Sequence, residues 1–180
     1  MPFTKLLPTS IDLAQNFTFT GTVAGAGGGI TGADMWRLDN DLAGDQNPIS
    51  SNLERVDDAS FEKIGTGMTQ SSGSWTFPAT GIWHVKFNVI LYANNSSDYV
   101  EGKILVTQNN SSYDMVAQSL SGATTGHAFN TGICECFVDV TDTSNVKVRF
   151  AVDQADASNK IRGTTGYQRT SFTFIRLGDT

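Results

Sequence analysis

Residues 75–91 read WTFPATGIWHVKFNVIL, and this stretch decides the fold. From residue 82 onward, large apolar side chains alternate with a second set, which is the period of a β-strand. The first set is Trp83, Val85, Phe87, Val89 and Leu91. The second set is Ile82, His84, Lys86, Asn88 and Ile90. The pattern predicts a long strand that turns the first set toward a core.

Similar short runs recur along the chain, with polar turn formers such as Thr141-Asp-Thr-Ser-Asn145 between them and no helical segment of useful length. The further predicted strands are Met35–Leu38, Leu53–Val56, Phe61–Ile64, Trp75–Phe77, Val100–Thr107, Asp114–Leu120, Ile133–Val140, Val146–Val152 and Ser171–Leu177. Evenly spaced strands without helices predict an all-β, two-sheet sandwich or jelly roll. We expect its core to include Trp75, Phe77, Trp83, Val85, Phe87, Val89 and Phe150.

The chain divides near residue 32. The stretch from Ala24 to Gly32 is mostly glycine and alanine and cannot build a core, so we expect residues 1–32 to form an N-terminal docking arm with a Gly-rich joint and residues 33–180 to form a jelly-roll head. The arm carries four apolar residues that it cannot bury alone, so we expect them to dock onto another chain. These residues are Ile11, Leu13, Phe17 and Phe19.

Composition excludes several classes of partner. The formal net charge is −6, so the basic patch that nucleic-acid binding requires has no obvious source. No apolar run approaches the ~20 residues that span a bilayer, and the first eight residues do not resemble a signal peptide. Cys134 and Cys136 lie two apart in a predicted strand, on one face, and are expected to be free thiols at or near the core.

Candidate catalytic and metal residues are few. His84 falls on the outward side of its strand and His127 in a Gly/Ala/Thr loop, without the positioned partners that a triad needs. Cys134-Glu-Cys136 lacks the spacing of a zinc knuckle. The acidic loop from Asp39 to Asp45 departs from the EF-hand pattern at Ala43, so a solvated turn is favoured and calcium is the open alternative. We expect no enzyme and no other cofactor.

Two stretches resemble a known superfamily. Trp75-Thr-Phe-Pro-Ala-Thr-Gly-Ile-Trp83 is similar to the entry into a long core strand of C1q/TNF-like jelly rolls, and Ser171-Phe-Thr-Phe-Ile-Arg-Leu-Gly178 resembles their aromatic-rich last strand. The resemblance covers residues 33–178 and implies a homotrimer without enzymatic activity. The chain has no collagen-like stem. Instead, Ile11-Asp-Leu-Ala-Gln-Asn-Phe-Thr-Phe-Thr-Gly-Thr-Val23 looks like the leader of virion proteins from marine and cyanobacterial phages.

The resemblances imply a structural protein of a bacteriophage virion, assembled in the host cytoplasm: a capsid decoration, head fibre or short tail appendage. Its expected partners are two further copies of itself and, through the arm, other virion proteins. The alternative is an adhesin or tail-fibre protein that binds a host receptor or surface glycan with its loops. The third hypothesis is a glycan-degrading enzyme, which is disfavoured because the sequence shows no recognisable pair of catalytic carboxylates.

Overall fold

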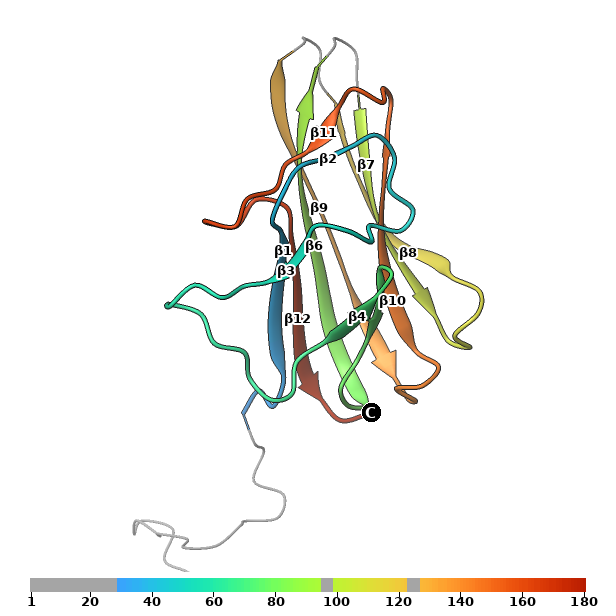
Figure 1. Ribbon diagram of the computed structural model, residues 1–180. Coiled ribbons are helices and arrows are strands. Elements are labelled where there is room, and N and C mark those ends of the chain that lie inside the picture. Colours follow the sequence, from blue (N-terminus) through green and yellow to red (C-terminus); the bar gives the residue numbers. More distant parts are fainter. Residues whose placement is uncertain (1–28, 95–98, 123–126) are drawn as a thin grey trace, which may run out of the picture.

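The computed structural model describes residues 29–94, 99–122 and 127–180, and within these ranges the chain is built from strands without any helix (Figure 1). The predicted all-β jelly roll is confirmed. The strands are β1 (Ala33–Leu38), β2 (Leu42–Ala43), β3 (Leu53–Arg55), β4 (Thr69–Ser71), β5 (Ser74–Thr76), β6 (Gly81–Ala93), β7 (Tyr99–Thr107), β8 (Asp114–Gly122), β9 (Ala128–Val140), β10 (Lys147–Gln154), β11 (Lys160–Ile161) and β12 (Ser171–Gly178).

The strands form two antiparallel sheets. The seven-stranded sheet runs β2-β11-β6-β12-β1-β3, and β9 pairs with the other side of β6 from Gly81↔Val140 to Ala93↔Ala128. The five-stranded sheet runs β4-β5-β10-β7-β8. β9 is therefore an edge of one sheet, and it lies beside β8, an edge of the other. Far-apart pairings such as β1 with β12 tie both ends of the described chain into one sheet.

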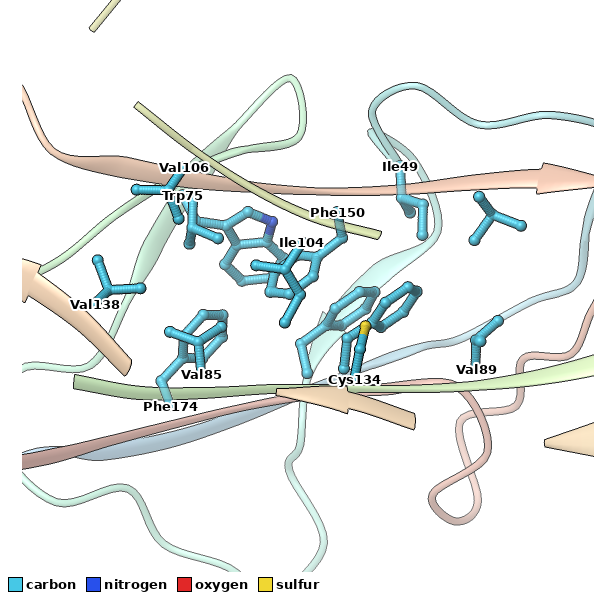
Figure 2. Packing of buried hydrophobic residues seen from close by; sticks show 14 of the residues in the cluster. Ile49, Trp75, Val85, Val89, Ile104, Val106, Cys134, Val138, Phe150 and Phe174 are labelled. Carbon is cyan, nitrogen blue, oxygen red and sulfur yellow. The ribbon is translucent and has the colours of Figure 1, made fainter. Parts of the chain in front are cut away.

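The core lies between the two sheets (Figure 2). On β6 the burial of successive side chains alternates as its sequence pattern predicts, with the set that begins at Trp83 inside and the set that begins at Ile82 outside. All seven residues expected in the core are at most 1% exposed. Phe172 and Phe174 of β12 join them, which settles the orientation of a strand whose two faces are both partly apolar.

One predicted strand is wrong. Residues 61–64 form no strand; Ile64 alone makes a bridge, to Ala33. The physical reason is local: the Phe61 amide donates to the carbonyl of Asp58 in a turn, so that only Ile64, at the end of the segment, reaches the start of β1. The sequence did not predict β2, β4 and β11, because these strands are two or three residues long and too short to show an alternation of apolar and polar residues.

Candidate interaction surface

The outer face of the seven-stranded sheet, the side turned away from the five-stranded sheet, carries a row of exposed apolar side chains on β9. Phe129, Ile133 and Phe137 are 64%, 52% and 72% exposed, and we call them the apolar row. They lie four residues apart, so all three point to the same side of the strand. The alternate residues Cys134 and Val138 are buried. β9 therefore has two apolar sides, and only one of them is used by the subunit's own core.

The neighbouring strands extend this surface. In register, Phe129 lies opposite Tyr92 and Phe137 opposite His84, while His84 lies opposite Ile175 of β12. The rings of Tyr92 and Phe129 have centroids 5.2 Å apart. Ile175 is half-buried and Leu177, further along β12, is 53% exposed. A large apolar surface of this kind on a monomer is typical of a protein contact.

A polar group lies beside the apolar row between Ile133 and Phe137. The Nε2 atom of His84 lies 3.1 Å from Oε2 of Glu135, and the His84 ring meets Phe137 edge-on with centroids 5.6 Å apart. Lys86 is the register partner of Glu135. A hollow of about 290 Å³ is lined here by His84, Glu135, Cys136 and Phe137. The surface thus combines apolar anchors with a small number of charged groups that can fix the register of a partner.

The chemistry of the hollow does not favour nucleophilic catalysis. Burial raises the pKa of Cys136 to about 11, and burial does the same for Cys134. A thiol with so high a pKa stays protonated near neutral pH, and the thiolate is the nucleophilic form. These cysteines are free, as expected, and Cys134 packs in the core.

Two polar networks brace the other margin of the sheet. The buried guanidinium of Arg37 donates to Glu54, Asp57 and Asp58, each at 2.8 Å. Burial acts to lower the pKa of Arg37, but the hydrogen bonds to Glu54 and Asp58 outweigh it, and the pKa is raised. This network holds the segment after β3 against β1.

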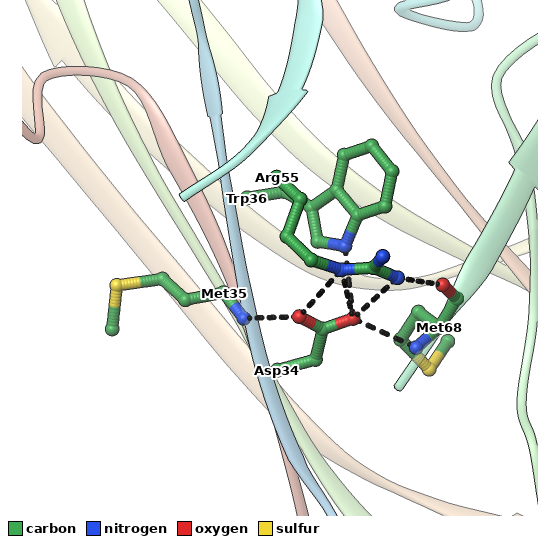
Figure 3. A network of polar contacts seen from close by, with 5 residues as sticks. All are labelled: Asp34, Met35, Trp36, Arg55 and Met68. Carbon is green, nitrogen blue, oxygen red and sulfur yellow. Dashed lines mark hydrogen bonds and ion pairs between the residues drawn. The ribbon is translucent and has the colours of Figure 1, made fainter. Parts of the chain in front are cut away.

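The second network centres on the buried carboxylate of Asp34 (Figure 3). It accepts from the Met68 amide at 2.7 Å, from the Trp36 indole at 3.0 Å and from the guanidinium of Arg55. Arg55 also donates to the Met68 carbonyl. The contacts tie β1, β3 and the chain before β4 together, which is a structural task.

The carboxylates of the acidic loop also hold the fold together. Asp41 forms an ion pair with Arg162 at 2.8 Å and accepts a hydrogen bond from the backbone amide of Gly163 at 3.0 Å. Asp45 accepts a hydrogen bond from the backbone amide of Gln154 at 2.7 Å. The described residues contain no group of three or more His, Cys, Asp or Glu side chains placed to hold a metal ion.

His127 and other aromatic side chains near the loops have partners within the subunit. The hydroxyl of Tyr92 lies 2.6 Å from Nδ1 of His127. Tyr113 lies under the guanidinium of Arg149, whose Cζ atom is 3.9 Å from the ring centroid. The arm residues Ile11, Leu13, Phe17 and Phe19 lie outside the described residues. In the part of the chain that is described, no helix is long and apolar enough for a bilayer crossing.

The apolar row was not predicted, although the sequence carries its signal. Phe129, Ile133 and Phe137 all have odd numbers, and the inward residues of β9 have even ones. Extending the predicted strand from Ile133 back to Ala128 makes the row visible. When both sides of a strand are apolar, however, the alternation does not indicate which side faces the subunit's own core.

Comparison with known proteins supports the fold. No protein-family model and no curated protein matches the sequence. Solved structures match the fold. They include murine APRIL (TM-score 0.60, 10% identity, 81% of this chain and 98% of that one). They also include Eiger TNF from S. frugiperda (TM-score 0.60, 9% identity, 82% of this chain and 93% of that one).

The globular domain of zebrafish complement 1qA is a third similar structure, with a TM-score of 0.54, 10% identity, and 83% of this chain and 99% of that one covered. Similarity that extends over nearly the whole of each neighbour indicates a shared topology and not a shared fragment. At 9–10% sequence identity, this similarity supports a shared architecture alone. The described head thus has the TNF/C1q-like jelly-roll fold.

Proposed function

We propose that this protein is a non-enzymatic structural component of a bacteriophage particle, whose head is a homotrimer and whose residues 1–32 attach it to other virion proteins. The observation that carries the trimer is the apolar row on the outer face of the seven-stranded sheet. Three large side chains on one strand, each more than half exposed, are better explained by a covering partner than by solvent.

A second copy of the chain is the partner that this surface fits. A ring of subunits closes through heterologous contacts, in which one patch of each subunit meets a different patch of the next. The apolar row lies on the edge strand β9, whereas Ile175 and Leu177 lie on β12, on the other side of β6. One subunit therefore offers two different parts of one apolar face, one on β9 and one on β12, as such a contact requires.

The proposed place in a virion rests on the leader. Residues 11–23 resemble the leaders of phage virion proteins, and the Gly-rich joint that follows would let an attached head keep its own orientation. If Phe17 and Phe19 dock onto another virion protein, that protein covers the apolar side chains of the arm. In this arrangement the trimer is displayed outward from the particle.

Sedimentation of the full chain tests the trimer. At micromolar concentration we expect three times the 19.3 kDa subunit mass. Phe137→Glu should shift the protein to monomer with unchanged circular dichroism, because a carboxylate would have to be buried in the contact. Met115→Glu, at an exposed apolar position of the five-stranded sheet, is the matched control and should remain trimeric. A monomeric wild-type protein would overturn the proposal.

Particle incorporation tests the virion role separately. In a phage that encodes this chain, Phe17→Asp combined with Phe19→Asp should leave the head trimeric while removing the protein from purified particles. Incorporation at the wild-type level would exclude docking through these two residues. Absence of the wild-type protein from purified particles would exclude the virion role altogether.

A further inference from the structure

We propose that in the trimer Arg169 of each subunit binds the hollow beside Glu135 and Phe137 of the next subunit. The inference rests on the trimer proposed above and goes beyond it, because it names a cation from one copy and its receptor on another. It starts from a loop and a hollow that share one face of the molecule.

The loop between β11 and β12, residues 162–170, projects from the seven-stranded sheet on the side away from the five-stranded sheet (Figure 1, red). Its base is closed by hydrogen bonds from the Thr170 amide to the Arg162 carbonyl at 3.2 Å and from the Thr164 amide to the Leu38 carbonyl at 2.8 Å. Asn88 of β6 donates to the carbonyl of Arg169 at 2.7 Å. The loop therefore stands on a fixed base.

Arg169, next to this base, presents a cation that lacks an anion. The guanidinium of Arg169 donates to the hydroxyl of Tyr167 at 2.7 Å and lies 5.2 Å from the centroid of its ring. Tyr167 is itself 55% exposed. Among the described residues, no carboxylate lies within ion-pair distance of Arg169. An arginine presented on an aromatic ring is a common anchor of protein contacts.

The hollow offers what that cation lacks. Glu135 has a side chain that is 57% exposed, and one of its oxygens lies 3.1 Å from the Nε2 atom of His84. Phe137 presents its exposed ring next to this carboxylate. A guanidinium placed here would form a charge-assisted hydrogen bond with Glu135 and lie against the Phe137 ring, two interactions that suit arginine better than lysine.

The geometry of a closed ring brings the two together. Loop and hollow both belong to the face that carries the apolar row, so each copy supplies one cation and one receptor. In a heterologous contact every cation then meets a receptor on the next copy, and none is left over. Because the pair is charged and directional, it fixes the register of an otherwise apolar contact.

Charge reversal tests the pair. Arg169→Glu and Glu135→Arg should each raise the concentration at which half the subunits are trimeric by about 30-fold, the effect of truncating one partner of a desolvated charge pair. The two changes combined in one chain should return this concentration to within about threefold of the wild-type value. Arg169 is half-buried and Glu135 is exposed, and neither belongs to the core, so we expect the subunit to fold, which circular dichroism checks. Single variants that assemble like the wild type would overturn the inference.

Cross-linking distinguishes a contact between subunits from one within a subunit. In a Cys136→Ser background, Arg169→Cys combined with Glu135→Cys should give covalently linked dimers and trimers on mild oxidation, seen by denaturing electrophoresis without reductant. Each single cysteine variant is the control. An intrachain disulfide at the monomer position, or no cross-link in a protein that sediments as a trimer, would overturn the Arg169 contact while leaving the trimer intact. A monomer at all concentrations would instead remove the trimer itself.

Discussion

The indole rings of Trp36 and Trp75 meet edge to face, with centroids 5.0 Å apart and planes at 90°. Trp36 belongs to the seven-stranded sheet and Trp75 to the five-stranded sheet, so the contact joins the two layers. Trp75 also packs against Phe150, Phe172 and Phe174, with centroids 5.9, 5.5 and 5.3 Å away. It lies at the centre of the aromatic core.

Trp75→Leu should lower the free energy of unfolding by about 3 kcal/mol, because it removes core contacts and leaves a cavity. Trp75→Phe should cost clearly less, about 1–2 kcal/mol, because the buried Nε1 of Trp75 has no hydrogen-bond partner among the described residues and its loss removes an unsatisfied donor. Urea unfolding measures both. Tyr99→Leu, at an exposed position, is the control and should be nearly neutral.

Gly163 should not tolerate a side chain. A Cβ at this position would lie 2.2 Å from the carbonyl oxygen of Asn40 and 2.4 Å from its carbonyl carbon, and backbone atoms cannot rotate away as a side chain can. Gly163→Ala should therefore destabilise the fold by about 1–3 kcal/mol, as overpacking does elsewhere.

The control for this prediction is Gly178→Ala, since a Cβ at Gly178 would have no heavy atom within 4 Å. Its thermal midpoint should stay within a degree or two of the wild type, on the order expected of a neutral surface change. Equal midpoints for Gly163→Ala and the wild type would show that the chain around Asn40 can move aside.

Arg37→Met should destabilise the fold by about 3 kcal/mol, because it leaves Glu54, Asp57 and Asp58 near one another without their cation. Asp57→Asn, which changes the most exposed of the three carboxylates, is the contrasting variant and should cost less than about 1 kcal/mol. Denaturant unfolding at constant salt compares them. Similar losses from the two variants would contradict the view that Arg37 is the centre of this network.

Much of the architecture follows from local pattern. The alternation from Trp83 to Leu91 predicts both the longest run of buried side chains and the face that carries them, because strand geometry leaves no other arrangement for a period of two. The strand around Phe150 follows for the same reason, whereas both faces of the last strand are partly apolar and only the structure shows that Phe172 and Phe174 point inward. Where two apolar residues lie three apart, as in Phe61 and Ile64, the pattern does not define a strand face, and the prediction there is wrong.

The candidate surface is harder to predict because it depends on pairings over long distances. That Phe137 lies opposite His84 depends on the register of β9 with β6, more than fifty residues earlier in the chain. That Asp41 forms an ion pair with Arg162 depends on two loops that meet only in the folded state. Neither relationship leaves a periodic signal in the sequence.

The buried thiols should make stability fall at alkaline pH. Burial raises the pKa of Cys134 and Cys136 to about 11 in the folded state, whereas a thiol in the unfolded chain titrates near about 8.5. Between these values the unfolded chain releases protons that the folded chain keeps, so rising pH favours unfolding, while below about pH 8.5 the contribution is fully present. The urea midpoint should therefore drop from pH 8.5 to 11, and Cys134→Ala with Cys136→Ser should drop less, since tyrosines and lysines titrate alike in both proteins. Parallel curves for the two proteins would show that thiol burial does not govern the alkaline limb.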